Sequence, residues 1–138
     1  MIRVAIDTNV VVSAALVRHD YPAAVLDPVV SGAIVPYVST AILAEYEEVL
    51  ARPRIKKSAG RAAEITDAIG AAGILVEPTR KLAVCSDADD NVFVECAAEI
   101  GADFLITGNI GDFPARYGVT RIVAPREFVE MWREMVKA

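Results

Sequence analysis

Acidic side chains follow several apolar segments of this 138-residue sequence: Asp7, Glu45, the cluster 87–90 and Asp112. Carboxylates crowded into one place repel one another, so one of them must take up a proton or a cation must neutralise them. Hard divalent cations such as Mg²⁺ and Mn²⁺ prefer oxygen ligands. The pattern therefore predicts a divalent-cation site, provided that the fold brings these acids to one place.

Other kinds of site are disfavoured by what the chain contains. The single histidine, His19, and the two cysteines, Cys85 and Cys96, lack the spacing of a Cys/His zinc site, and we interpret both cysteines as inert thiols. No glycine-rich phosphate loop or dinucleotide fingerprint follows the first apolar run. That run also lacks a following Asp-x-Asp, which disfavours a haloacid-dehalogenase-type phosphatase. A receiver domain would need a lysine where Asn109 stands.

The elements that must position these acids alternate between strand-like and helix-like patterns. Strands are predicted at residues 3–6, 34–38, 75–77, 104–107 and 121–123, with helices at 10–16, 22–31, 40–50, 61–70, 90–100 and from 125 onward. Thr8 is expected to cap the first helix and Gly70 to end the fourth. This alternation indicates parallel βαβ units in an α/β sandwich. Ligands of such sheets bind beyond the carboxyl ends of the strands, where the acids fall.

Composition indicates one folded domain over residues 1–138. The chain is 54% hydrophobic and 24% charged, and its mean hydropathy of +0.39 excludes a disordered chain. Its apolar runs are shorter than the about 20 residues of a membrane span, and no signal peptide is evident, so we expect a cytoplasmic protein without membrane contact. The alanine-rich apolar excess favours a homodimer, with the helices at 22–31 and 39–50 as its faces.

Charge is distributed unevenly along the chain. A formal net charge of −5 disfavours a protein that coats DNA without specificity. Residues 52–61 nevertheless carry five basic side chains and no acid. We expect Arg52, Arg54 and Lys57 to attract the phosphate backbone of RNA, with a solvated loop as the alternative interpretation.

Four motifs in order resemble the PIN-domain nucleases, in particular stand-alone bacterial and archaeal PIN proteins related to VapC-type toxins. They read VAIDTN at 4–9, STAILAE at 39–45, DADDN at 87–91 and GADFLITGN at 101–109, and IVAPREF follows at 122–128. The resemblance covers nearly the whole chain. It implies a three-layer α/β sandwich with a five-stranded parallel sheet flanked by helices. It also implies Mg²⁺- or Mn²⁺-dependent cleavage of RNA, and it extends to a toxin whose partner is an antitoxin protein.

Matched residue by residue, the resemblance assigns catalytic and metal-binding roles to Asp7, Glu45 and Asp90. The spacing from Gly101 selects Asp90 over Asp89 as the third acid. The fourth acid departs from the family, which often has aspartate at the position of Asn109; a variant of the pattern places it at Asp112 instead. We take Asp112 as the fourth catalytic and metal ligand. Small polar residues are expected to line the site: Thr8, Asn9, Thr107 and Asn109.

Simpler roles compete with each assignment. Asp7 could cap a helix, Glu45 could be solvated and Asp112 could be a loop acid, although apolar neighbours at Ala41 and Val49 place Glu45 on the core side of its helix. Two other functions also stay open. Asn109 keeps open a degenerate PIN fold that acts as a binding module, and the acids alone would also suit a metallohydrolase of small phosphoesters.

Overall fold

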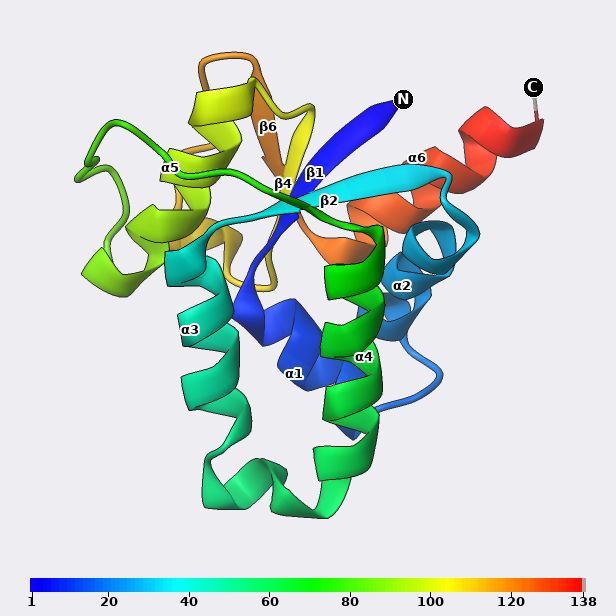
Figure 1. Cartoon of the computed structure of the whole chain (residues 1–138). Helices are drawn as coiled ribbons and strands as arrows, with labels where there is room; N and C mark the ends of the chain where they lie inside the picture. Colours follow the sequence, from blue (N-terminus) through cyan, green and yellow to red (C-terminus); the bar gives the residue numbers. More distant parts are fainter. Residues whose placement is uncertain (138) are drawn as a thin grey trace.

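The computed structural model describes residues 1–137 and has a six-stranded sheet with the strand order β3-β2-β1-β4-β6-β5 (Figure 1). Five strands run parallel: β1 (Ile2–Ile6), β2 (Ile34–Val38), β3 (Ile74–Leu75), β4 (Phe104–Ile106) and β6 (Thr120–Val123). The predicted five-stranded parallel sheet is confirmed. A sixth strand, β5 (Arg116–Tyr117), adds antiparallel to β6. The sequence pattern missed β5 because two residues give no alternation, and its pairing depends on a turn in which Gly118 has φ +57°.

Helices cover both faces of the sheet. They are α1 (Thr8–Leu16), α2 (Tyr21–Ser31), α3 (Thr40–Leu50), α4 (Ala59–Ala72), α5 (Asn91–Ile100) and α6 (Pro125–Lys137), with short 3₁₀ turns η1 (Pro53–Ser58), η2 (Ala88–Asp90) and η3 (Ile110–Asp112). Figure 1 shows α3 and α5 on one side of the sheet and α2 and α6 on the other. The helices α3 and α4 extend below the sheet, joined by η1, and both contact α1. The described residues contain no helix long and apolar enough to cross a membrane.

Several predicted helix boundaries differ from the observed ones by one or two residues, and two of the predictions failed for a physical reason. The N-cap of α1 is Asp7, not Thr8, which is the buried first residue of the helix. The helix α4 continues through Gly70 to Ala72 because Ile65 and Ile69 on its inner face are buried in the core. Tertiary packing of that face outweighs the weak helix propensity of one glycine. Ala138, the last residue of the predicted domain, lies outside the described residues.

The register of the central strands determines which residues meet below the sheet. Ile6 at the end of β1 pairs with Ile106 at the end of β4, and Ile106 pairs with Val123 of β6. The residues that follow Ile6 and Ile106, Asp7 and Thr107, therefore leave the sheet side by side although they are 100 positions apart in the chain. Apolar residues of β1 and β4 are buried beneath α5, which contacts both strands.

Candidate functional site

Asp7 is a buried carboxylate at the carboxyl end of the central strand. Its side chain is 3% exposed, and its Oδ2 accepts a hydrogen bond of 2.7 Å from the Thr107 hydroxyl. Burial raises the pKa of Asp7, opposed by the Thr107 hydroxyl and by backbone N–H groups of Thr8 and Asn9 at the start of α1. Burial disfavours the charged form of a carboxyl. A cation bound next to Asp7 would therefore stabilise its ionised form.

Hydrogen bonds to Asn9 and Thr107 hold the loop after β4 against the start of α1. The backbone N–H of Gly108 donates to Asn9 Oδ1 at 2.9 Å, and that of Asn109 donates to Thr107 Oγ1 at 3.0 Å. A single hydroxyl, that of Thr107, thus links Asp7 to the β4 loop. Thr107 and Asn9, which were expected to line the site, therefore help to fix the position of the Asp7 carboxylate.

Glu45 reaches the same region from α3. It is half-buried, and burial raises its pKa, reinforced by the charge of Asp89. The neighbouring Tyr46 is buried, and its hydroxyl donates to the backbone carbonyl of Ile6 at the end of β1. This hydrogen bond ties α3 to the strand that presents Asp7. Of the two apolar neighbours expected to place Glu45 on the core side of its helix, Val49 is buried and Ala41 is exposed.

Asp90 comes from the turn that opens α5. Partial burial and the charges of Asp7 and Asp87 raise the pKa of its carboxyl to about 7. The adjacent Asn91 is buried and accepts hydrogen bonds of 3.0 Å from the backbone N–H groups of Val84 and Cys85, which holds the preceding loop in place. Asp87 caps the η2 turn through a 3.0 Å bond from the N–H of Asp89.

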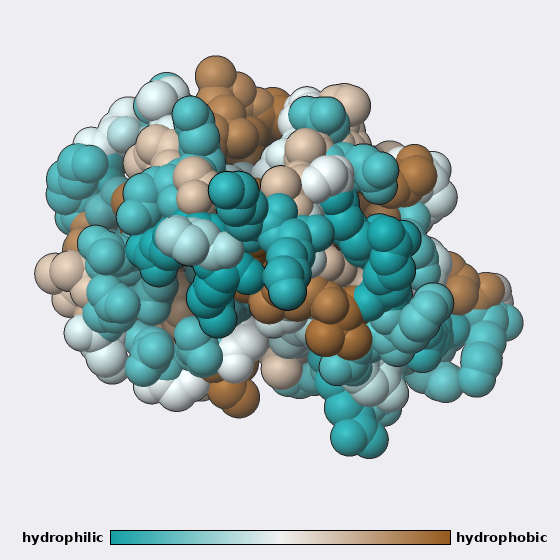
Figure 2. All heavy atoms as spheres, turned by 90° about the horizontal axis from the view of Figure 1, so that it is seen from below, coloured by the Kyte–Doolittle hydropathy of each residue, from teal (hydrophilic) through white to brown (hydrophobic). Residues whose placement is uncertain are grey.

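A cavity of about 230 Å³ brings three of the four predicted acids together, since Asp7, Glu45 and Asp90 all line it. The predicted lining residues Thr8, Asn9 and Asn109 also border it. The cavity lies beyond the carboxyl ends of β1 and β4, since its wall includes Asp7 and Asn109. In Figure 1 β1 runs downward to this end, and the view from below in Figure 2 shows a mostly hydrophilic surface.

Asp112 does not border the cavity, whereas Asn109 does. The η3 turn nevertheless keeps Asp112 near the acids, so that its negative charge contributes to the raised pKa values of both Asp7 and Asp90. Its backbone carbonyl also accepts a 2.9 Å hydrogen bond from Ser86 N in the loop before Asp90. Asp112 is thus within electrostatic reach of the site but outside its wall.

The predicted basic residues divide into two groups. Arg52 and Arg54 border the acidic cavity, and Lys57 does not. The guanidinium of Arg52 forms an exposed ion pair with Glu48 at 3.0 Å, and its charge partly opposes the rise in the pKa of Glu45 that burial causes. Two cations therefore stand at the rim of a cavity whose wall is acidic.

The donor set of this cavity fits a hard divalent cation. All candidate ligands are oxygens, and none of the ion pairs formed within residues 1–137 includes Asp7, Glu45 or Asp90. Thr8 Oγ1 is buried in the cavity wall without a hydrogen-bond partner. Within the described residues, no three acidic, histidine or cysteine side chains converge closely enough to form a ready-made cage. The acids surround a shared space, and a bound ion would have to draw them inward.

Sequence reasoning missed two participants. Ser13 borders the cavity four residues after Asn9, on the same face of α1. Tyr46 anchors α3 to β1. The spacing of Ser13 from Asn9 could have indicated the first, whereas an aromatic residue in an amphipathic helix carries no sign of its hydrogen-bond partner.

Comparisons with known proteins identify similar proteins and a family. A family model described as a PIN domain matches residues 3–111. The uncharacterized protein MJ1680 of Methanocaldococcus jannaschii is 30% identical, and the match covers 98% of this chain and 94% of that protein. A chain in the crystal structure of VapBC2 from Rickettsia felis, bound to a DNA fragment from their promoter, superposes with a TM-score of 0.58. That match covers 88% of this chain and 98% of the other at 14% identity, so it concerns the fold.

Proposed function

Because this chain belongs to the PIN-domain family, we propose that its single domain, residues 1–138, is a metal-dependent endoribonuclease that hydrolyses RNA phosphodiester bonds. One observation carries the proposal: Asp7, Glu45 and Asp90, from three separate elements, border one cavity at the carboxyl ends of the strands. Their raised pKa values have burial as the first cause. Perturbed carboxyls gathered in a cleft are typical of a catalytic centre.

The chain's own residues would hold and orient a Mg²⁺ or Mn²⁺ ion in this cavity. Asp7, Glu45 and Asp90 would supply carboxylate ligands, and the 2.7 Å bond from Thr107 would fix the rotamer of Asp7. Asp112, or the amide oxygen of Asn109, would complete the site. When bound, such an ion lowers the pKa of a water molecule and neutralises charge that develops on the phosphate.

Single-stranded RNA suits this site better than a rigid duplex. Its splayed backbone can enter a narrow acidic cavity, whereas the grooves and phosphates of a duplex are held in fixed positions. Arg52 and Arg54 at the rim would counter the repulsion between the phosphates and the acids. Lys57 lies outside the rim, so it would attract the RNA backbone only through its long-range positive charge.

The test is cleavage of a fluorogenic single-stranded RNA by purified protein in Mn²⁺, Mg²⁺ or EDTA. We expect turnover with either metal, none in EDTA, and none from the Asp7→Asn variant with either metal. A small phosphoester offered in parallel separates a nuclease from a hydrolase of small molecules. RNA that binds but stays intact in every metal would identify a binding module and contradict the proposed enzyme.

The structural likeness to a chain of VapBC2 supports a toxin–antitoxin role for this protein. We propose that its partner is an antitoxin protein. The test is co-expression with the product of the adjacent gene. A stable complex with suppressed RNA cleavage would support the role, and independent migration of the two proteins would contradict it.

We also propose a homodimer. Large apolar side chains are exposed on several elements, among them Val30 on α2 and Leu43 on α3, the two helices expected at the interface. Exposed apolar patches commonly mark such contacts. Light scattering at working concentration should give twice the chain mass, and a monomer mass would contradict this expectation.

A further inference from the structure

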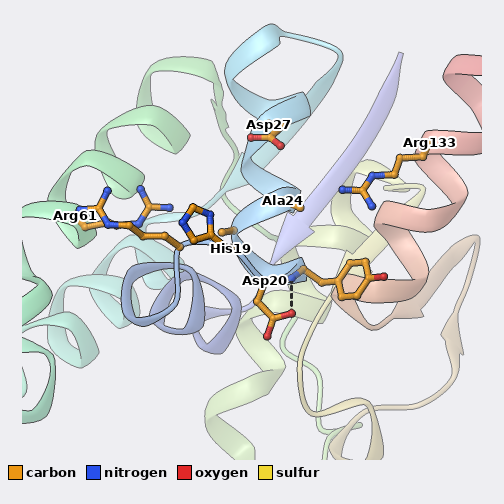
Figure 3. Close-up of a pocket in the computed structure, with 9 residues that line it drawn as sticks. His19, Asp20, Ala24, Asp27, Arg61 and Arg133 are labelled. Carbon is orange, nitrogen blue, oxygen red and sulfur yellow. Dashed lines mark hydrogen bonds between the residues drawn. The ribbon is translucent and has the colours of Figure 1, made fainter.

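A second cavity, separate from the acidic one, lies around the turn between α1 and α2. It measures about 530 Å³, and its wall includes Arg18, Arg61 and Arg133, each from a different part of the chain. Figure 3 shows Arg61 and His19 at one end and Arg133 reaching toward α2 from α6 at the other. We call this space, defined by the three arginines, the arginine cavity.

The three arginines have no carboxylate within 4.0 Å in the described residues, since none of the ion pairs there includes them. Arg61 is nevertheless positioned, because its Nε donates to the carbonyl of Ala14 in α1 at 3.1 Å. That bond leaves the two terminal nitrogens of its guanidinium as donors. Guanidinium groups in this state are suited to bind phosphate oxygens.

Two aspartates also border the arginine cavity, and their positions limit how far they oppose an anion. The carboxylate of Asp20 is engaged as the cap of α2, where it accepts a 2.8 Å hydrogen bond from the N–H of Tyr21. Asp27 lies two turns further along α2 and, in Figure 3, away from His19 and Asp20. The wall of the cavity therefore carries three arginines against two aspartates, one of which is already engaged as a helix cap.

The helix α1 connects the two cavities. Asn9 and Ser13 border the acidic cavity, and Leu16, on the same helix face, is 46% exposed. Arg18, two residues after Leu16, borders the arginine cavity. With nine residues, α1 is about 13 Å long. A few nucleotides of single-stranded RNA span such a distance, so one strand can contact both cavities.

We propose that the arginine cavity binds backbone phosphates of the RNA strand, a few nucleotides away from the bond that is cut. The inference rests on the proposed function only for the identity of the ligand as RNA. Arg18 and Arg133 are exposed donors that contact phosphate, and Arg61 is a donor held in position by α1. The cavity supplies affinity and positions the strand, and it takes no part in the bond cleavage.

The experiment measures how binding of a labelled single-stranded RNA depends on salt. EDTA is present, so that binding is recorded without metal-dependent cleavage. For single strands the logarithm of the binding constant falls with that of the salt concentration, with a slope of about −0.7 for each phosphate contacted. Arg18→Gln and Arg133→Gln should each reduce the steepness of the slope by about 0.7. Arg18→Lys keeps the charge and should retain most of the slope, which a packing role would not predict.

The matched control is Arg116→Gln, the same substitution on the exposed edge strand β5, outside both cavities. It should leave the slope unchanged. Wild-type slopes in Arg18→Gln and Arg133→Gln, or an equal loss in Arg116→Gln, would overturn the proposal. Cleavage in Mn²⁺, measured separately, distinguishes the two hypotheses. Salt-dependent binding through these arginines without cleavage would refute the ribonuclease alone, and cleavage with unchanged arginine variants would refute this site alone.

Discussion

The metal-free protein should become less stable as the pH rises, because its clustered acids then ionise. Asp90 shows the effect most clearly: partial burial and the charges of Asp7 and Asp87 raise its pKa from 3.8 to about 7. A carboxyl with a higher pKa in the folded than in the unfolded chain binds protons preferentially in the folded state. Its contribution to stability is complete below the unfolded-state value of about 4 and is lost as the pH rises through about 7.

The size of the effect follows from this shift and from the exposure of Asp90. A change from 3.8 to about 7 corresponds to at most about 4 kcal/mol, at about 1.4 kcal/mol for each tenfold change in proton affinity. Because Asp90 is only partly buried, solvent screens its charge, and we expect about 1–2 kcal/mol. For a domain of this size that is a fall in Tm of about 3–8 °C between about pH 5 and pH 8.

The assay is thermal unfolding in EDTA at constant ionic strength between about pH 5 and pH 8, a range above the ordinary carboxyl titration. Asp90→Asn should unfold at a higher temperature than the parent at the upper end of the range and should show a flatter profile. Glu64→Gln, at an exposed position on α4, is the matched control and should follow the parent. With Mn²⁺ the trend should reverse, because metal and protons compete for the same carboxylates.

One result would refute the reasoning about Asp90. If the parent and Asp90→Asn show parallel Tm profiles in EDTA, ionisation of the Asp90 carboxyl does not destabilise the folded protein. If Mn²⁺ leaves both profiles unchanged, the cavity bordered by Asp7, Glu45 and Asp90 does not hold that ion.

The remaining predictions concern five substitutions. Asp7→Asn should reduce metal-dependent RNA cleavage by more than about 100-fold, yet raise the Tm in EDTA because it removes a buried charge; undiminished turnover would exclude Asp7 as a ligand. Asp112→Asn should weaken Mn²⁺ binding in a calorimetric titration more than Asn109→Ala does, because a neutral amide oxygen binds a hard cation weakly; equal affinity in both variants and the parent would exclude both residues. Gly70→Ala in the last turn of α4, where a Cβ would meet no atom within 4 Å, should stabilise the protein by about 0.5–1 kcal/mol. Gly73→Ala should destabilise it, because a Cβ there would lie 2.5 Å from the carbonyl oxygen of Ile69; chemical denaturation measures both, and equal effects would contradict this account.

Local sequence signals were sufficient for the elements that position the site. The run Ile34–Val38 was predicted with the bounds that the strand has, since it is rich in β-branched and aromatic residues, which favour strands. Ser39 is the N-cap of α3, and its hydroxyl accepts a 3.1 Å bond from Ile42 N; serine is a residue type that favours this position. The placement of Asp7 after a buried strand also followed from sequence, because a change from apolar to polar residues marks a strand end.

Tertiary structure alone decided how the acids interact. Asp7 and Thr107 meet only because Ile6 and Ile106 pair in register, and such long-range pairing leaves no periodic trace in the sequence. Sequence could identify Asn109 and Asp112 as alternatives, but the η3 turn determines that Asn109 borders the cavity and Asp112 acts from outside it. Burial, which raises the pKa of Asp7, is likewise a property of the assembled layers. Residue type and spacing can specify a carboxylate at a strand end, whereas its distance from other charges and from water exists only once the strands and helices have packed.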